Sequence, residues 1–402
     1  MREVYANPAL RRLTLAQLVS MFGDFLAIFA VFSIVSFRLH GSPAQVSGIM
    51  IAYMLPMAFV GPVAGVFIDR WNVKRTMIIS DLVRSVLVLA LLWTHQIWQI
   101  YTVMILLSSI SSFFSPAQTI AIRSMVPKEG LMAANAAMMQ VLQVTQIFSP
   151  GVAALLIRAV GESACFWLDG ASFLFSATMV STVTINRVAP AAAKEVSGLI
   201  SDFTEAIKFM ATHSKLAFAI SAMAAGMFAI RCYSALIAVY VRDILHAQTQ
   251  LFGALSTLVG IGMMIGTALV TKFTRTRSRE HTVMIGLFVV AVGILFLALF
   301  GNVPLTVVMT LTMGFGVAMI IIPAQALMQG ATPMNMLGRV TSSFMSVLSL
   351  AQIAGLVLSG SIAQVIGIQK SYLVTSIVLV MLAAAGWRVV EQQKKQPETV
   401  SA

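Results

Sequence analysis

Long apolar segments alternate along this chain with short connections that hold most of its charged residues. Each apolar segment is about 20 residues or longer, the length that an α-helix needs to cross a hydrocarbon layer about 30 Å thick. Charged residues make up 10% of the chain and apolar residues 59%, whereas an ordinary soluble domain has about 25% charged residues. The pattern excludes a water-soluble fold and predicts a chain that crosses a membrane many times.

Twelve such segments can be delimited in the 402 residues. We therefore predict an all-α polytopic membrane protein with twelve transmembrane helices. The spans and their short loops account for nearly all of the chain, so we expect no separate catalytic domain within it. The predicted spans are 13–37, 44–68, 76–94, 98–124, 133–157, 164–186, 216–240, 251–271, 282–300, 304–330, 340–365 and 371–389.

The longest connection lies between the sixth and seventh spans and divides the helices into six and six. We predict an N-terminal bundle at 1–186, a cytoplasmic linker at 187–215, and a C-terminal bundle with a short tail at 216–402. In the linker, SGLISDFTEAIKFM places apolar residues on one stripe at helical spacing, and Asp202 and Glu205 can start a helix as a capping box does. We expect an amphipathic strut on the membrane face rather than a docking site for a partner.

The basic residues fall mainly on one side of the predicted topology. Of the 26 Lys and Arg residues, 20 lie at or near the side that holds the N-terminus, 4 lie at the other side and 2 lie within helices. Loops rich in Lys and Arg remain in the cytoplasm, so we expect both termini to be cytoplasmic. The net charge of +12 then follows from membrane orientation, and we expect no nucleic-acid partner.

A short charged connection, GPVAGVFIDRWNVKR, joins the second and third spans. Five of its residues follow the pattern G-x-x-x-D-R-x-x-x-K-R: Gly65, Asp69, Arg70, Lys74 and Arg75. After the second of twelve helices, this pattern resembles the loop between helices 2 and 3 of the major facilitator superfamily, a family of secondary transporters. The resemblance implies a gating motif, although Phe67 and Asn72 stand where the family usually has Leu and Gly.

Several further phrases are similar to one branch of that superfamily. They are MFGD in the first span, SDLVR in the third, FFSPAQ and VPKEGLMAANA around the fourth and fifth, and VYVRDIL after the seventh. The branch holds macrolide-efflux-type exporters, and siderophore exporters and lysophospholipid transporters are similar at some of these places. The resemblance covers nearly the whole chain and implies an exporter in the bacterial inner (plasma) membrane.

An ordered set of residues recurs along the chain with an offset of 206 or 207. Chance hardly explains an ordered set, so we infer an internal repeat of two six-helix halves. In the superfamily that the chain resembles, halves related in this way hold the substrate site between them near the midplane. The matched pairs are Pro116 with Pro323, Ala117 with Ala324, Gln118 with Gln325, Pro127 with Pro333, Gln146 with Gln352 and Gly161 with Gly367.

Asp24 lies about eleven residues into the first span, or roughly 16 Å at 1.5 Å per residue, near the midplane of the membrane. A charged carboxylate facing lipid at that depth costs several kcal/mol, so it must face a wet cavity, find a cation or take a proton. The structural alternative is a paired or hydrogen-bonded carboxyl group. Because the first helix lines the central cavity in the superfamily that the chain resembles, we expect Asp24 to couple transport to protons.

Four more charged residues lie within the spans and form a candidate network of buried charge. Asp81 and Arg84 are spaced i,i+3 on the third span, so we expect a structural or gate-bracing pair in its cytoplasmic third. Arg231, deep in the seventh span, has no acidic residue within a turn. It can neutralise Asp24 or Asp169, or it can bind an anionic group in the cavity. We expect Asp169 to lie closer to the headgroups.

A set of Phe and Met side chains would suit an adaptable apolar pocket for substrate. The alternative is that they form ordinary packing or lipid-facing surface. The candidates are Phe113, Phe114, Met138, Met227 and Phe315.

We expect a transporter that exports amphiphilic or hydrophobic small molecules by alternating access, driven by proton antiport. The alternative is a transporter of lysophospholipids or other lipids without obligatory proton coupling, and a remote alternative is a non-transporting sensor or scaffold, which would need neither the Asp69 loop nor a buried Asp24. The sequence holds no His/Cys/acid cluster, nucleophile motif or phosphate loop, so we expect no enzyme, cofactor or metal site. The expected partners are the substrate, protons and membrane lipids, and we expect a monomer.

Overall fold

The computed structural model describes residues 7–68, 70–127, 130–185, 196–276, 278–333 and 336–395. Within these ranges, twelve helices are long and apolar enough to cross a membrane, which confirms the predicted all-α polytopic architecture. The elements are α2 (Pro8–Ser33), the π-helical turn η1 (Ile34–Arg38), α3 (Pro43–Ile68), α4 (Val73–Ala90), the 3₁₀ turn η2 (Leu91–Trp93), α5 (Ile97–Met125), α6 (Leu131–Val160), α7 (Glu162–Ser181), α8 (Val196–Thr212), α9 (Ser214–Asp243), α10 (Thr249–Thr276), α11 (Arg279–Leu299), α12 (Val303–Ala331), α13 (Leu337–Ile366) and α14 (Ile368–Lys395).

The chain forms two compact units. The first comprises Met1–Ala193 and Ala247–Thr257, and the second comprises Lys194–His246 and Leu258–Ala402. The linker helix α8 therefore groups with the second unit, and α10 begins in the first unit and continues in the second.

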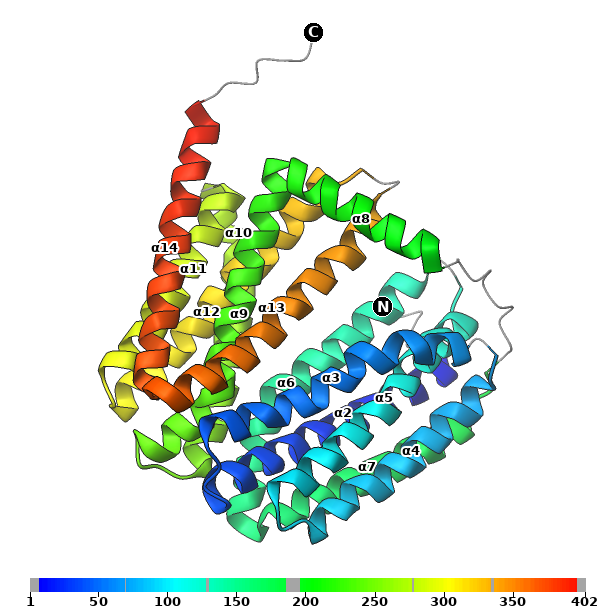
Figure 1. Ribbon diagram of the computed structural model, residues 1–402. Coiled ribbons are helices and arrows are strands. Elements are labelled where there is room, and N and C mark those ends of the chain that lie inside the picture. The colour runs from blue at the N-terminus through cyan, green and yellow to red at the C-terminus, as the bar shows by residue number, and fades with distance from the viewer. Residues whose placement is uncertain are drawn as a thin grey trace. The chain divides into compact units, whose positions relative to one another are not determined.

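Within the first unit, α2 packs against α6 and α7, α4 packs against α5 and α7, and α3 packs against α5 (Figure 1). Helices distant in sequence are thus neighbours, and α2, α4 and α7 form a connected group through α7. The helix ends on the side where α2 begins enclose an apolar core. This core contains Leu10, Leu13, Ile68, Met77, Phe114, Ala117, Ala121, Ile122, Val126, Ala134 and Val180.

Asparagine side chains cap several helix starts. Asn72, in the charged connection, caps α4: its side-chain oxygen accepts a hydrogen bond from the Arg75 backbone N–H at 3.0 Å. Its backbone is extended, with φ −77°, so the position does not need the left-handed conformation that favours glycine. The substitution of Asn for the Gly usual in the family motif therefore supplies a helix cap.

The internal repeat is visible in the ends of two long helices. Gly161 ends α6 and Gly367 ends α13, with φ of +96° and +89° respectively. Each donates its backbone N–H to a carbonyl four residues earlier, Ile157 and Ala363. This backbone conformation favours glycine, which explains why the same residue recurs at the offset of 206.

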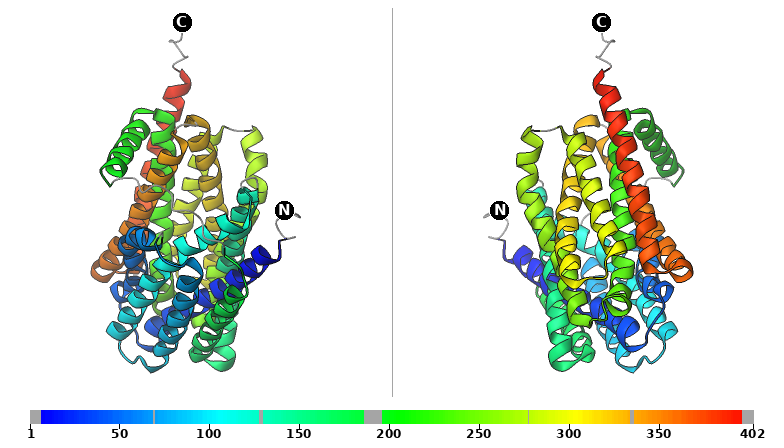
Figure 2. Two further views of the ribbon diagram at one scale, coloured as in Figure 1. Left: turned by 90° about the vertical axis from the view of Figure 1, so that its right-hand side faces the viewer. Right: turned by 90° about the vertical axis from the view of Figure 1, so that its left-hand side faces the viewer.

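In the second unit, α11 packs between α12 and α14, and α9 packs against α12, α13 and α14. Helix α8 crosses near one end of α9 and α13 instead of running beside them (Figure 1). Its Glu205 pairs with Arg339 at the start of α13, at 3.0 Å between Oε2 and Nη1. Helix α14 extends past its neighbours in this unit (Figure 2).

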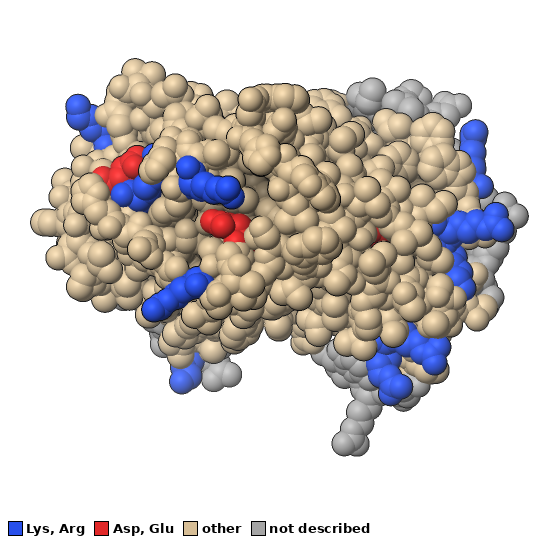
Figure 3. All heavy atoms as spheres, turned by 90° about the horizontal axis from the view of Figure 1, so that it is seen from below, with Lys and Arg blue, Asp and Glu red and all other residues tan. Residues whose placement is uncertain are grey.

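The surface fits a lipid environment. Seen from below the view of Figure 1, most of the visible surface carries neither acidic nor basic side chains (Figure 3). Many large apolar side chains on the transmembrane helices are exposed, among them Phe59, Val86, Leu155 and Phe288. Such exposure is costly in water and favourable against hydrocarbon.

Candidate functional site

A cluster of four charged side chains lies inside the first unit, contributed by α2, α4 and α7. Arg84 of α4 forms a buried ion pair with Asp81 one turn earlier. The Nη1 atom of the same guanidinium lies 3.9 Å from Oδ2 of Asp24 on α2. The side chains of Arg84 and Asp81 are 5% and 0% exposed, whereas that of Asp24 is 26% exposed. We call these residues, together with Asp169, the acid cluster.

Asp169 joins the acid cluster from α7, which corrects the expectation that it lies close to the headgroups. The residue is 1% exposed. Its Oδ1 accepts a hydrogen bond from the Ser172 hydroxyl at 3.1 Å, and it lies against Gly23 on α2. A Cβ at Gly23 would lie only 2.5 Å from that oxygen, so glycine is what allows α7 to bring Asp169 beside Asp24.

Two phenylalanine rings cover the guanidinium of Arg84. The centre of its guanidinium lies 4.5 Å from the ring centroid of Phe114 and 4.4 Å from that of Phe173. Both distances are within the range of a cation–π interaction, which strengthens where water is excluded. Phe114 is 4% exposed and packs on Arg84, so in this structure its ring covers the acid cluster.

The depth of Arg84 explains why the structure unites residues that the sequence assigned to different roles. Helix α4 begins at Val73, three residues before the predicted start. Arg84 therefore lies eleven residues, or about 16 Å, from the start of α4 and near the middle of the span Val73–Trp93, as Asp24 lies near the middle of the span Pro8–Arg38. The Asp81–Arg84 pair lies beside Asp24, and a comparison of depths across spans is the sequence signal that would have found it.

Arg231 has its partner within the second unit. Its Nε donates a hydrogen bond of 2.8 Å to Oε1 of Gln352 on α13. The structure thus provides an uncharged partner, whereas the sequence pointed to Asp24 or Asp169. Gly355, one turn beyond Gln352, faces α9: a Cβ there would lie 2.6 Å from the carbonyl oxygen of Phe228 and 3.2 Å from Cβ of Arg231.

The repeat relates the two charged sites. Asp24 and Arg231 differ by 207 positions (231 − 24), the offset that separates Pro116 from Pro323. Asp24 is the 17th residue of α2 and Arg231 is the 18th residue of α9, counted from Pro8 and Ser214. Equivalent places in the two halves therefore carry opposite charges.

The gating motif is only partly described. Asp69 lies outside the described residues, and Gly65 is within α3. Arg70, the residue after Asp69 in the sequence, is exposed. The Nζ of Lys74 donates to the Ser181 carbonyl oxygen at 2.6 Å, which connects the start of α4 to the end of α7. Arg75 contributes its backbone N–H to the Asn72 cap.

The remaining candidates for a substrate pocket are distributed over several helices. Phe113 stacks on Trp71 with 5.8 Å between ring centroids. The Nε2 of Gln118 donates a hydrogen bond to the Sδ of Met138 at 3.6 Å. Phe113 and Met138 both pack beside the apolar core of the first unit. Met227 is half-buried on α9. Phe315 lies on α12, where its backbone packs closely against Gly266 of α10.

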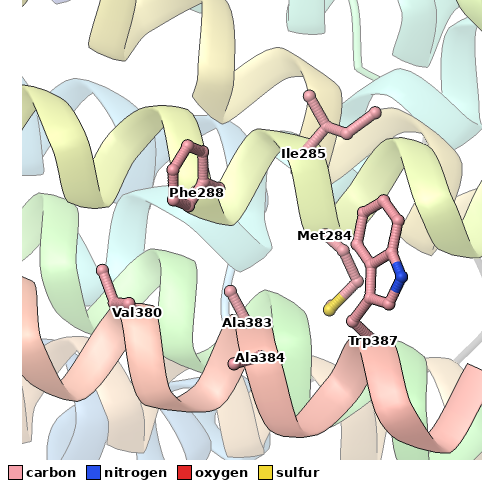
Figure 4. Close-up of a pocket in the computed structure, with 7 residues that line it drawn as sticks. All are labelled: Met284, Ile285, Phe288, Val380, Ala383, Ala384 and Trp387. Carbon is pink, nitrogen blue, oxygen red and sulfur yellow. The ribbon is translucent and has the colours of Figure 1, made fainter.

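An apolar groove runs between α11 and α14 in the second unit. Figure 4 shows side chains from both helices directed into it, with the Trp387 indole opposite Met284 and Ile285. The lining contains no ionisable side chain, so the groove suits a hydrocarbon chain and offers nothing to a charged group. Among the described residues, no group of His, Cys, Asp and Glu side chains could hold a metal ion.

The sequence matches the family model of the Major Facilitator Superfamily over residues 13–353 and again over 216–402. It is 26% identical over 386 residues to the uncharacterized MFS-type transporter YfiS of Bacillus subtilis (strain 168), covering 93% of this chain and 91% of that protein. It is 26% identical to the multidrug efflux pump Tap of Mycolicibacterium fortuitum, covering 85% and 86%. It is 25% identical to macrolide efflux protein A of Streptococcus pyogenes, again covering 85% and 86%.

Solved structures share the fold. A bacterial homologue of the human lysosomal transporter Spinster, in an inward-facing and unoccupied conformation, superposes with a TM-score of 0.76 at 12% identity, covering 98% of this chain and 99% of that one. The nucleoside transporter NupG superposes with a TM-score of 0.72 at 13% identity, covering 95% and 98%. With its twelve spanning helices, its internal repeat and the family match along almost its whole length, this chain belongs to the Major Facilitator Superfamily.

Proposed function

We propose that this transporter exports amphiphilic or hydrophobic small molecules by alternating access, driven by proton antiport through the acid cluster. The observation that carries the proposal is the charge of that cluster: two carboxyl groups, Asp24 and Asp81, face one guanidinium, and a third, Asp169, lies against Gly23 beside Asp24. The named functions of Tap and of macrolide efflux protein A, both efflux proteins, support export.

Charge balance is the reason for assigning protons to this cluster. With all three carboxyl groups ionised and Arg84 charged, the cluster carries a net charge of −2 in a membrane interior, which costs several kcal/mol. Oδ2 of Asp81 and Nε of Arg84 are buried without a hydrogen-bond partner among the described residues, so local hydrogen bonds offset only part of this cost. Uptake of a proton by one carboxyl group lowers this free-energy cost, because it reduces the net charge of the cluster.

Asp24 is the residue of the cluster best placed to exchange that proton. It is part-exposed, whereas Asp81 and Asp169 are almost completely buried. Its contact with Arg84 is long, at 3.9 Å, while Asp81 holds the guanidinium closely. The charged form of Asp24 is attracted to Arg84 and repelled by Asp169, and protonation removes both interactions. A change in the hydration of Asp24 between two states of the transporter would then load and release the proton.

The test is transport by purified protein in proteoliposomes, with a macrolide, a cationic dye and a lysophospholipid as cargo, with and without a pH gradient. We expect Asp24→Asn to bind cargo but to lose uphill export driven by the gradient. Asp243→Asn is the matched control, because Asp243 is an exposed acid at the end of α9. If Asp24→Asn moves cargo uphill at the wild-type rate, the proton assignment is wrong and a lipid transporter without proton coupling becomes the better proposal.

We further propose that the protein lies in the bacterial inner membrane with both termini in the cytoplasm. The support is the uneven distribution of Lys and Arg across the topology. Labelling of cysteines placed at residues 5 and 398 with a membrane-impermeant reagent tests it: in intact cells neither position should react, and after permeabilisation both should. Reaction in intact cells would place that terminus outside.

A further inference from the structure

The Arg231 side chain is charged, held in place and incompletely partnered. It lies within α9 at the 18th of 30 residues, and Gln352 lies near the middle of α13. Gln352 accepts a hydrogen bond from Nε only. The described residues of the second unit provide no carboxylate partner for this guanidinium and no acceptor for its two Nη atoms. Arg231 is half-buried, and neither Nη atom is among the fully buried polar atoms of the described residues that lack a hydrogen-bond partner.

The contact with Gln352 orients the guanidinium without neutralising it. An amide oxygen accepts a hydrogen bond but carries no formal charge. Binding at Nε fixes the plane of the guanidinium and leaves the two Nη donors as a fork, the arrangement that binds a carboxylate or phosphate through two parallel hydrogen bonds. The close packing of α9 on Gly355, one turn from Gln352, holds the two side chains in register.

An uncompensated guanidinium at this depth costs free energy that an anion would offset. We propose that Arg231, positioned by Gln352, binds an acidic group of the transported molecule, so that the cargo is an amphiphile with a carboxylate or a phosphate. This rests on the proposed function of transport but not on its coupling to protons. A cationic or neutral amphiphile gains no comparable interaction from Arg231.

The experiment measures equilibrium binding to the full-length protein in a non-ionic detergent, without any gradient. Four fluorescent probes share one dodecyl chain and differ in the head group: a carboxylate, a phosphate, a hydroxyl and a trimethylammonium group. We expect wild type to bind one or both acidic probes about tenfold or more tightly than the other two, the size expected for hydrogen bonds to a charged group. The carboxylate and phosphate probes show which acidic group the site prefers.

Variants test the residues. Arg231→Gln should abolish the preference for the acidic probes and leave the affinity for the hydroxyl probe unchanged, while Arg231→Lys should retain part of it, because an ammonium keeps the charge but loses the fork. Gln352→Met, of similar size, should weaken acidic binding by removing the orientation of the guanidinium. Arg123→Gln is the matched control, because Arg123 is an exposed arginine in the last turn of α5.

Two results would overturn the proposal. One is that wild type and Arg231→Gln bind all four probes alike. The other is that Arg231→Gln impairs folding or binding only while Asp24 is charged, so that adding Asp24→Asn restores wild-type behaviour, which would make Arg231 a counter-ion of the first half. Thermal unfolding of each variant identifies misfolded protein. If Arg231→Gln is misfolded, Gln352→Met tests the proposal in its place, and unchanged binding of the acidic probes by this variant would contradict it. A failure of gradient-driven export with selective acidic binding intact would count against proton antiport alone.

Discussion

Nη1 of Arg84 on α4 lies 3.9 Å from Oδ2 of Asp24 on α2, and both of these helices pack against α7. One guanidinium therefore faces two carboxylates, since Asp81 binds it at the same time. The closer partner is fully buried and the more distant one is part-exposed. This asymmetry separates a structural pair, Arg84 with Asp81, from an exchangeable one, Arg84 with Asp24.

Removal of Arg84 should strongly destabilise the first bundle. In Arg84→Gln, Asp81 would remain buried without its cation, and breaking a buried pair in this way costs about 3–5 kcal/mol. We expect a large fall in the thermal unfolding midpoint in detergent. The double variant Arg84→Gln/Asp81→Asn should recover part of the loss, because it removes the orphaned charge. Equal unfolding midpoints for wild type and Arg84→Gln would contradict the buried pair.

A methyl group at Gly23 should disturb the acid cluster. The Cβ of Gly23→Ala would lie 2.5 Å from Oδ1 of Asp169, so α2 and α7 must separate or the carboxyl group must move. Overpacking of this kind typically costs about 1–3 kcal/mol. Gly61→Ala is the control, since a Cβ at Gly61 meets nothing within 4 Å. Thermal unfolding of both variants, together with gradient-driven export, measures the effect. Similar behaviour of the two variants would show that this helix contact is loose.

The ion pair between Glu205 and Arg339 should contribute little to stability. Their side chains are 57% and 41% exposed, and pairs at that exposure are worth about 0–1 kcal/mol and weaken with salt. We expect Glu205→Gln to change the unfolding midpoint slightly and to have no effect at high ionic strength. A large loss of stability that persists in salt would indicate that α8 is held to α13 mainly by this contact.

The gating prediction concerns Asp69 and is based on the motif alone. From the family resemblance, we expect Asp69 to close the cytoplasmic side by facing the positive end of the helix that begins near Gly338 and Arg339. Such a contact is worth about 1 kcal/mol, so Asp69→Asn should shift the population towards the inward-open state about fivefold. Accessibility of cysteines introduced on the cytoplasmic side reports the shift, because both native cysteines, Cys165 and Cys232, are buried. Unchanged accessibility would remove Asp69 from the gate.

The sequence alone determined the class of fold and the number of spans. A membrane interior accepts only helices or closed barrels, and each span must be apolar and about 20 residues long, so both constraints can be read locally. The repeat could be read in the same way, because a helix end with positive φ at Gly161 and Gly367 favours one residue type.

The partners of the buried charges were decided only by tertiary structure. The i,i+3 spacing gave the Asp81–Arg84 pair, because both residues lie on one helix. It could not show that Asp24 and Asp169 join them, since the three helices meet at a register set by packing, in which Gly23 leaves room for the Asp169 carboxyl group. The sequence also could not show that Gln352 holds Arg231. Gln352 is uncharged and lies 121 residues later, so no charge pattern links the two residues. Long-range contacts between helices depend on which small side chains allow close approach, and that selection is made by the folded bundle as a whole.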